Sequence, residues 1–122
     1  MSEFVDKQWF VDQSAEVIET IDIGGRKLRI KSLDYITRAE ANAKAAALSK
    51  NGEELDPEQF AVNTALLTMV ASIVDETGMR IFTDSEDDLN ILRRLRGRFA
   101  DPIDQKIQEL SFAPRAGQPL GN

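Results

Sequence analysis

Residues 56–74, with the sequence DPEQFAVNTALLTMVASIV, decide the fold of this chain. Asp56 is predicted to cap a helix, Pro57 suits its first position, and Gln59 lies three residues after the cap, which makes a variant of the capping box. The apolar side chains that follow are Phe60, Val62, Leu66, Leu67, Met69, Val70, Ile73 and Val74. They cover most of the circumference of a helix that extends to about Val74. We therefore expect this helix to be the central and most buried one.

A β-hairpin is predicted over residues 17–31, VIETIDIGGRKLRIK. Gly24-Gly25 provides the positive φ angles that a tight two-residue turn requires. Such a turn places Ile21 opposite Leu28 on one face of the ribbon and an opposite-charge pair on the other. Because an isolated hairpin is only marginally stable, we expect it to pack on a helical body.

Three further helices are expected around the central one. Ser32 is predicted to cap a helix over residues 33–48, which Asn51-Gly52 ends with turn chemistry. The segment Thr83-Asp84-Ser85-Glu86 matches a full capping box, and Asp101-Pro102 is predicted to start the last helix. The predicted fold class is α+β and mostly α, with an N-terminal β-hairpin packed on a bundle of about four helices.

Composition divides the chain into three segments. Residues 1–15 form an N-terminal arm, residues 16–112 a single globular helical domain with the hairpin at its start, and residues 113–122 a flexible C-terminal tail. The arm contains Phe4 and Trp9, and its apolar residues follow neither the spacing of a helix nor that of a strand. We favour an arm that folds back onto its own domain. The alternative is an arm that docks into a neighbouring subunit or a partner, since aromatic side chains serve well as interface anchors.

The 122 residues include neither histidine nor cysteine. Their absence excludes Ser–His and Cys–His nucleophile pairs, and it excludes zinc sites built from imidazole or thiolate. Acidic residues cluster at positions 84–88, but a calcium-binding loop would need glycine and glutamate where Leu89 and Leu95 stand. No glycine-rich phosphate loop is present. We therefore expect no enzymatic activity, no metal site and no cofactor.

The net charge is −6, with 42% hydrophobic and 30% charged residues, which is the balance of a globular protein. The non-specific attraction of an acidic chain to nucleic acid backbones or anionic lipids should be weak, although a local basic cluster could still bind phosphate. The longest apolar run, residues 65–74, is far shorter than the roughly 20 residues that cross a bilayer. We therefore expect a soluble protein whose partners are other proteins, with no nucleic acid and no membrane among them.

Four arginines, Arg93, Arg94, Arg96 and Arg98, lie within six residues of each other. We expect them at the C-terminal end of the helix that the acidic cap opens. Acids in the first turn and arginines in the last would match the helix dipole, so the helix is predicted to be a solvated one. A second interpretation is that the arginines contact an acidic partner surface, because four exceed what capping requires.

The order of three motifs resembles a known family. A Gly-Gly hairpin leads into a leucine-led helix (GGRKLRIKSL), a buried helix leads into an acidic turn and a phenylalanine (VASIVDETGMRIF), and an acidic cap opens the next helix (TDSEDDL). Over Val17 to Phe112 the chain is similar to the tail assembly chaperones of long-tailed (siphovirus-type) bacteriophages and prophages. Each of these motifs is also common turn and capping chemistry.

This resemblance implies a binding protein of the host bacterial cytoplasm. Members of the family bind the tape measure protein, keep it soluble until tail tube protein polymerises around it, and are absent from the finished virion. The implied partners are the tape measure protein and the tail tube protein, with a homo-oligomer as an open alternative. The family has no catalytic residues to carry over.

Three candidate partner-binding surfaces follow from the residues. They are the alanine-rich face with Ala43, Ala46 and Ala47, the arm with Phe4 and Trp9, and the arginine cluster Arg93, Arg94, Arg96 and Arg98. An alternative function is a small acidic phage-encoded inhibitor, or a mimic of nucleic acid, that binds a host protein; it predicts carboxylates gathered on one face. A carboxylate metalloenzyme, the third alternative, predicts a pocket with at least two converging acids.

Overall fold

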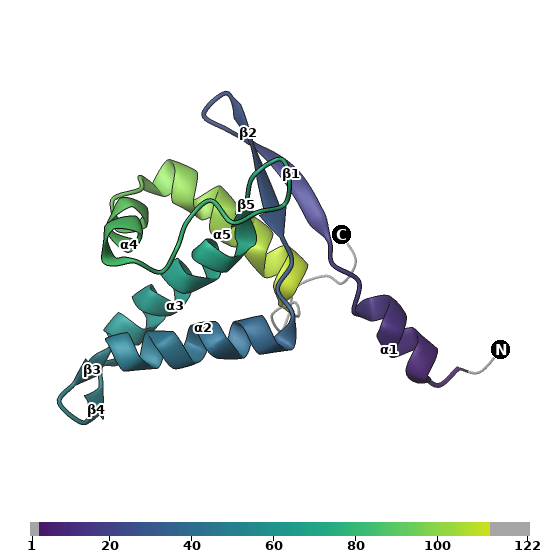
Figure 1. Ribbon diagram of the computed structural model, residues 1–122, viewed down its shortest axis with the longest axis horizontal. Coiled ribbons are helices and arrows are strands. Elements are labelled where there is room, and N and C mark those ends of the chain that lie inside the picture. The colour runs from purple at the N-terminus through teal and green to yellow at the C-terminus, as the bar shows by residue number, and fades with distance from the viewer. Residues whose placement is uncertain (1–2, 113–122) are drawn as a thin grey trace.

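Helix α3 (Pro57–Ser72) runs through the centre of the structure, a computed structural model that describes residues 3–112 (Figure 1). Asp56 caps the helix as predicted, because its carboxylate accepts the N–H groups of Glu58 (3.0 Å) and Gln59 (3.3 Å). Every residue in 66–74 is buried. The prediction of a central buried helix is confirmed.

The last two residues of the predicted helix are a strand instead. Ile73 and Val74 leave the helix and form β5 (Ile73–Val74), which pairs antiparallel with the hairpin: Ile73 is opposite Ile30 and Val74 is opposite Arg29. The boundary predicted at Val74 is therefore wrong by two residues. Two β-branched side chains can bury themselves equally well in a strand, and pairing with the open edge of the hairpin satisfies its backbone groups.

The hairpin consists of β1 (Ile18–Ile23) and β2 (Arg26–Lys31), and the sheet order is β1-β2-β5. Its register is the predicted one, with Ile21 opposite Leu28 and Asp22 opposite Lys27. The turn glycines have φ angles of 56° and 79°, as a primed turn requires. Helices α3 and α5 pack against β2, so the expected fold class, α+β and mostly α, is confirmed.

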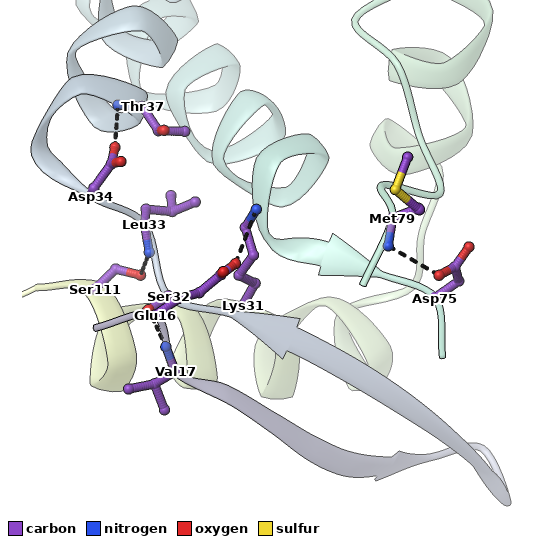
Figure 2. Close-up of polar contacts among 10 residues, drawn as sticks. All are labelled: Glu16, Val17, Lys31, Ser32, Leu33, Asp34, Thr37, Asp75, Met79 and Ser111. Carbon is purple, nitrogen blue, oxygen red and sulfur yellow. Dashed lines mark hydrogen bonds and ion pairs between the residues drawn. The ribbon is translucent and has the colours of Figure 1, made fainter. Parts of the chain in front are cut away.

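Helix α2 (Tyr35–Leu48) begins two residues later than predicted, and its cap is Asp34 rather than Ser32. The Asp34 carboxylate accepts the N–H of Thr37 at 2.7 Å. Ser32 prolongs the hairpin instead, because its hydroxyl accepts the N–H of Val17 at 2.9 Å and its own N–H donates to the Val17 carbonyl (Figure 2). The difference arises because extending the sheet occupies the Ser32 side chain.

A second, smaller hairpin joins α2 to α3. It is formed by β3 (Lys50–Asn51) and β4 (Glu54–Leu55), where the sequence predicted only a turn. A buried polar pair fixes its base: the side-chain amide of Asn63 donates to the Ser49 hydroxyl at 2.9 Å. The Asp56 N–H also donates to the Ser49 carbonyl. These bonds hold α2 and α3 side by side along the alanine-rich side of α2.

Helix α4 (Glu86–Arg93) is capped by Ser85, so the capping box predicted at Thr83 is displaced by two residues. The Ser85 hydroxyl accepts the N–H of Asp88, whose carboxylate accepts the N–H and hydroxyl of Thr83 at 2.6 and 2.8 Å. Thr83 is therefore a donor to the acidic turn and not its cap. The expected acids in the first turn are present.

Helix α5 (Gly97–Ser111) starts four residues before the predicted Asp101-Pro102, and Pro102 lies inside it. A proline at that depth deprives the Arg98 carbonyl of its helical donor. Burial outweighs this cost, because Ile103 and Ile107 of the following turns are among the most buried side chains of the core. Pro102 therefore lies in the interior of this helix and does not start it.

Buried side chains from most of these elements form one core. Its members are Ile30, Ala41, Ala45, Leu66, Leu67, Met69, Val70, Ile73, Leu89, Leu92, Ile103 and Ile107. Leu110 and Phe112, at the end of α5, are partly buried and pack against this cluster. No helix within residues 3–112 has the length and apolar character needed to cross a membrane.

The N-terminal arm contains a short helix, α1 (Lys7–Gln13), where the sequence predicted no regular structure. Its cap is Asp6, whose carboxylate accepts the N–H of Trp9. All residues in 3–17 are exposed, and the helix projects from the end of β1 away from the other helices (Figure 1). The favoured interpretation, an arm folded back onto its own domain, is therefore wrong. The predicted tail, 113–122, lies outside the described residues.

Candidate partner-binding surfaces

Helix α2 has two alanine-rich sides with different surroundings. Ala41 and Ala45 face α3 and are buried, with Ala45 fully covered. Small side chains at these positions let the two helices approach closely. The side chain of Ile36, by contrast, is 66% exposed.

The opposite side of α2 is an apolar surface that the described residues leave uncovered. Its members are Ile36, Ala39, Ala43, Ala46 and Ala47, here called the α2 outer face. Ala46 is partly buried and the others are exposed. At 100° per residue these positions fall within one side of the helix, and the strip from Ile36 to Ala47 is about 17 Å long. The structure thus brings Ala43 and Ala46 together, and it adds Ile36 and Ala39.

Aromatic side chains form a second exposed surface on the arm. Trp9 packs edge-on against Phe10 with ring centroids 5.1 Å apart, and the side chains of Phe4, Trp9 and Phe10 are 78%, 45% and 60% exposed. No residue of α1 is buried. Exposed aromatic groups of this size are typical of surfaces that become covered by a partner. In Figure 1, α1 lies beyond one end of α2 and not along it.

The four arginines do not share one helix, contrary to the prediction. Arg93 ends α4 and binds Glu86 at 2.9 Å, and Arg94 is the C-cap of α4. Arg96 is the N-cap residue of α5, and Arg98 lies in its first turn, where its guanidinium stacks on the Phe99 ring at 4.6 Å. The dipole argument therefore applies to Arg93 and Arg94 alone. For Arg96 and Arg98 the positive helix end is unfavourable.

A pocket that the sequence did not indicate lies between α2, α3 and the segment before α4. It encloses about 300 Å³. Apolar side chains of α3 and Phe82 form part of its lining, and Lys44 binds Asp84 across it at 2.8 Å. Lys44 stands far from the acidic segment in sequence, so no local pattern could have paired them.

The same pocket bears on the metalloenzyme alternative. Glu40 and Asp84 both line it, but the bond from Lys44 lowers the pKa of Asp84 and occupies one of its oxygens. Within the described part of the chain, no group of three or more acidic side chains is placed to hold a metal ion. The pocket is therefore lined by both polar and apolar side chains, and its described residues include no set of three acidic ligands.

Many aspartates use their oxygens inside the fold. The side-chain hydroxyl of Thr77, the N–H of Met79 and the N–H of Thr77 all bond to the Asp75 carboxylate and lower its pKa. Figure 2 shows the bond from Met79. The N–H of Thr37 lowers the pKa of Asp34 in the same way. These acids are spread over separate turns and caps, an arrangement that does not favour a nucleic acid mimic.

Stability is expected to decline at acidic pH because of these bonds. An aspartate with a lowered pKa in the folded state stabilises the fold above its ordinary value of 3.8, and this contribution is lost as the pH falls through the lowered value. We therefore expect the free energy of unfolding to decrease as the pH is lowered below 3.8. Urea unfolding measured at a series of pH values tests this.

In an Asp75→Asn variant, the free energy of unfolding should decline less steeply with falling pH than in the wild type. The variant has no carboxylate at this position, so protonation no longer removes a charge that Thr77 and Met79 stabilise. Glu53→Gln is the control, since the Glu53 side chain makes no hydrogen bond or ion pair within residues 3–112. An Asp75→Asn profile parallel to the wild-type profile would contradict the assigned role of this carboxylate.

Comparisons with known proteins assign no family to the chain. No family model, no curated protein and no solved structure matches it significantly.

Proposed function

We propose that this chain is a tail assembly chaperone of a long-tailed bacteriophage or prophage. It binds and solubilises the tape measure protein in the host bacterial cytoplasm, assists tail tube assembly and is absent from the mature virion. It carries out no chemistry of its own. The resemblance in the hairpin, the central helix and the acidic cap supports this proposal.

The α2 outer face is the observation that carries the proposal. A strip about 17 Å long matches the contact length of one helix packed on another. Its alanines would let the backbone of a client helix approach closely, and Ile36 would supply the larger apolar contact at one end. The net charge of −6 would keep complexes apart from each other, which is what a long apolar client requires.

Co-expression with the tape measure protein is the direct test. We expect the client to move from the insoluble to the soluble fraction, and a complex of the two chains to be recovered by purification. A client that stays insoluble with the wild-type chain, and that yields no complex, would refute the chaperone function.

A charge on the α2 outer face should abolish this effect. Ala43→Asp places a carboxylate in the middle of the apolar strip, where a client helix would have to bury it, and burying an unpaired charge is costly. The matched control is Asn42→Asp, which adds the same charge at the next, exposed position outside the strip. Equal solubilisation by both variants would show that the client binds elsewhere.

A further inference from the structure

The hairpin tip and the α4–α5 junction meet at one end of the molecule. Gly24, in the turn, lies so close to the first turn of α5 that an added Cβ would be 3.1 Å from the Phe99 ring. The tip and the start of α5 lie in the same upper part of Figure 1. Gly24 and Phe99, which are 75 positions apart in the sequence (99 − 24), thus lie side by side.

This contact brings basic residues of both segments to the same end of the molecule. The hairpin contributes Arg26, and the junction contributes Arg94, Arg96 and Arg98. Lys27 is the next residue along β2 and belongs to the other face of the ribbon, where it stands opposite Asp22. We call the four arginines the cationic end. They are four of the 15 lysines and arginines of a chain whose net charge is −6.

The arginines of the cationic end have few partners of their own. Within the described residues, Arg26, Arg94 and Arg96 make no side-chain hydrogen bond and no ion pair. Arg98 only stacks on Phe99. Elsewhere in the fold, the basic side chains of Arg93, Lys31, Lys44 and Lys106 are bound to carboxylates.

Local physics opposes this arrangement. Arg96 stands at an N-cap position without a side-chain cap, where serine, threonine, asparagine or aspartate would stabilise the helix. Arg96 and Arg98 also face the positive end of the α5 dipole, and the neighbouring arginines repel each other. A sequence that breaks several local rules at one place without an internal gain is typical of a functional surface.

We infer that the cationic end binds an acidic polypeptide segment, with arginines pairing its carboxylates. Planar guanidinium groups bind carboxylates through two parallel hydrogen bonds, which suits arginine better than lysine. This surface is separate from the α2 outer face, so the inference does not depend on the chaperone function. It gives the chain a site for an acidic protein in addition to an apolar one.

Two observations favour a protein segment over a nucleic acid. Asp101 lies beside Gly97, which stands between Arg96 and Arg98 in the chain, so a phosphate backbone that continues past these arginines would meet negative charge. Phe99 is covered by Arg98 and approached by Gly24, which leaves its ring unsuited to stacking a base. A short acidic segment of a protein can place single carboxylates on the arginines and neutral residues beside Asp101, and it needs no stacking on the Phe99 ring.

Binding of a labelled, short polyglutamate peptide, measured by fluorescence anisotropy at low salt, tests the inference. We expect wild-type binding that weakens as salt is added. Single-stranded RNA of similar length forms the second arm. Tighter binding of RNA than of the peptide, or no binding of the peptide, would overturn the inference.

Two substitutions separate a binding role from a structural one. Arg96→Asp should weaken peptide binding roughly tenfold, yet raise the midpoint of thermal unfolding by roughly 4 °C because aspartate caps α5. Arg26→Asp, in the hairpin, should weaken peptide binding by a similar factor. Lys50→Asp, on the small hairpin at the opposite end of Figure 1, changes the net charge equally and is the control. Equal loss in all three would attribute binding to net charge alone and overturn the site.

Discussion

Replacing Ile30 by alanine is expected to lower the free energy of unfolding by about 2–5 kcal/mol. Ile30 is completely buried in the middle strand of the sheet, where it stands opposite Ile73 and belongs to the core cluster. Truncation removes the apolar contacts of the side chain and leaves a cavity between β2 and the helices, which cannot close fully because two elements hold the strand. Urea unfolding at neutral pH measures the loss.

Ile36→Ala is the matched control for Ile30→Ala. The Ile36 side chain is 66% exposed on α2, so the same chemical change should alter the free energy of unfolding by less than about 0.5 kcal/mol. If the two variants unfolded alike, β2 would not lie over the core, and the arrangement of the hairpin on α3 and α5 would be wrong.

The elements that the sequence predicted correctly carry their signals within a few residues. The Gly24-Gly25 turn imposes the hairpin register through its φ angles. Asp56 and Pro57 mark the start of α3. The Asp56 side chain accepts hydrogen bonds from N–H groups of the first turn, and Pro57 has no N–H that would need a partner. Neither signal depends on contacts with distant parts of the chain, so tertiary packing changed neither the turn nor the helix start.

The errors occur where a distant segment decides the outcome. Ile73 leaves the helix because the hairpin edge is available to it, and Ser32 cannot cap α2 because Val17 already uses its hydroxyl. Pro102 stays inside α5 because burial of Ile103 and Ile107 outweighs its lost hydrogen bond. Each of these causes is invisible in a short window of sequence.

The candidate surfaces were predicted by residue type but not by geometry. Ala43 and Ala46 were identified by small size, while the side of α2 that faces outward depends on where α3 packs. The arginines were noticed by their density, yet their separation into two helices and their proximity to Arg26 follow from the contact between Gly24 and Phe99. The pocket depends likewise on the pairing of Lys44 with Asp84.

The second large change in the free energy of unfolding is expected at the contact between α2 and α3. Ala45 is fully covered at the contact with α3, so Ala45→Leu should lower the free energy of unfolding by about 1–3 kcal/mol, because the added side chain has no space. Ala43→Leu introduces the same atoms two positions away, on the exposed side, and should change it by less than about 0.5 kcal/mol.

The contrast between these two variants tests the premise of the client surface directly. If Ala43→Leu were as destabilising as Ala45→Leu, Ala43 would be buried against the body and the α2 outer face would not be available to a partner helix. If Ala45→Leu were harmless, α2 and α3 would be too far apart for alanine to be required between them. Only the predicted difference, a costly change on one side and a neutral one on the other, leaves a helix with one side packed and one side open to a client.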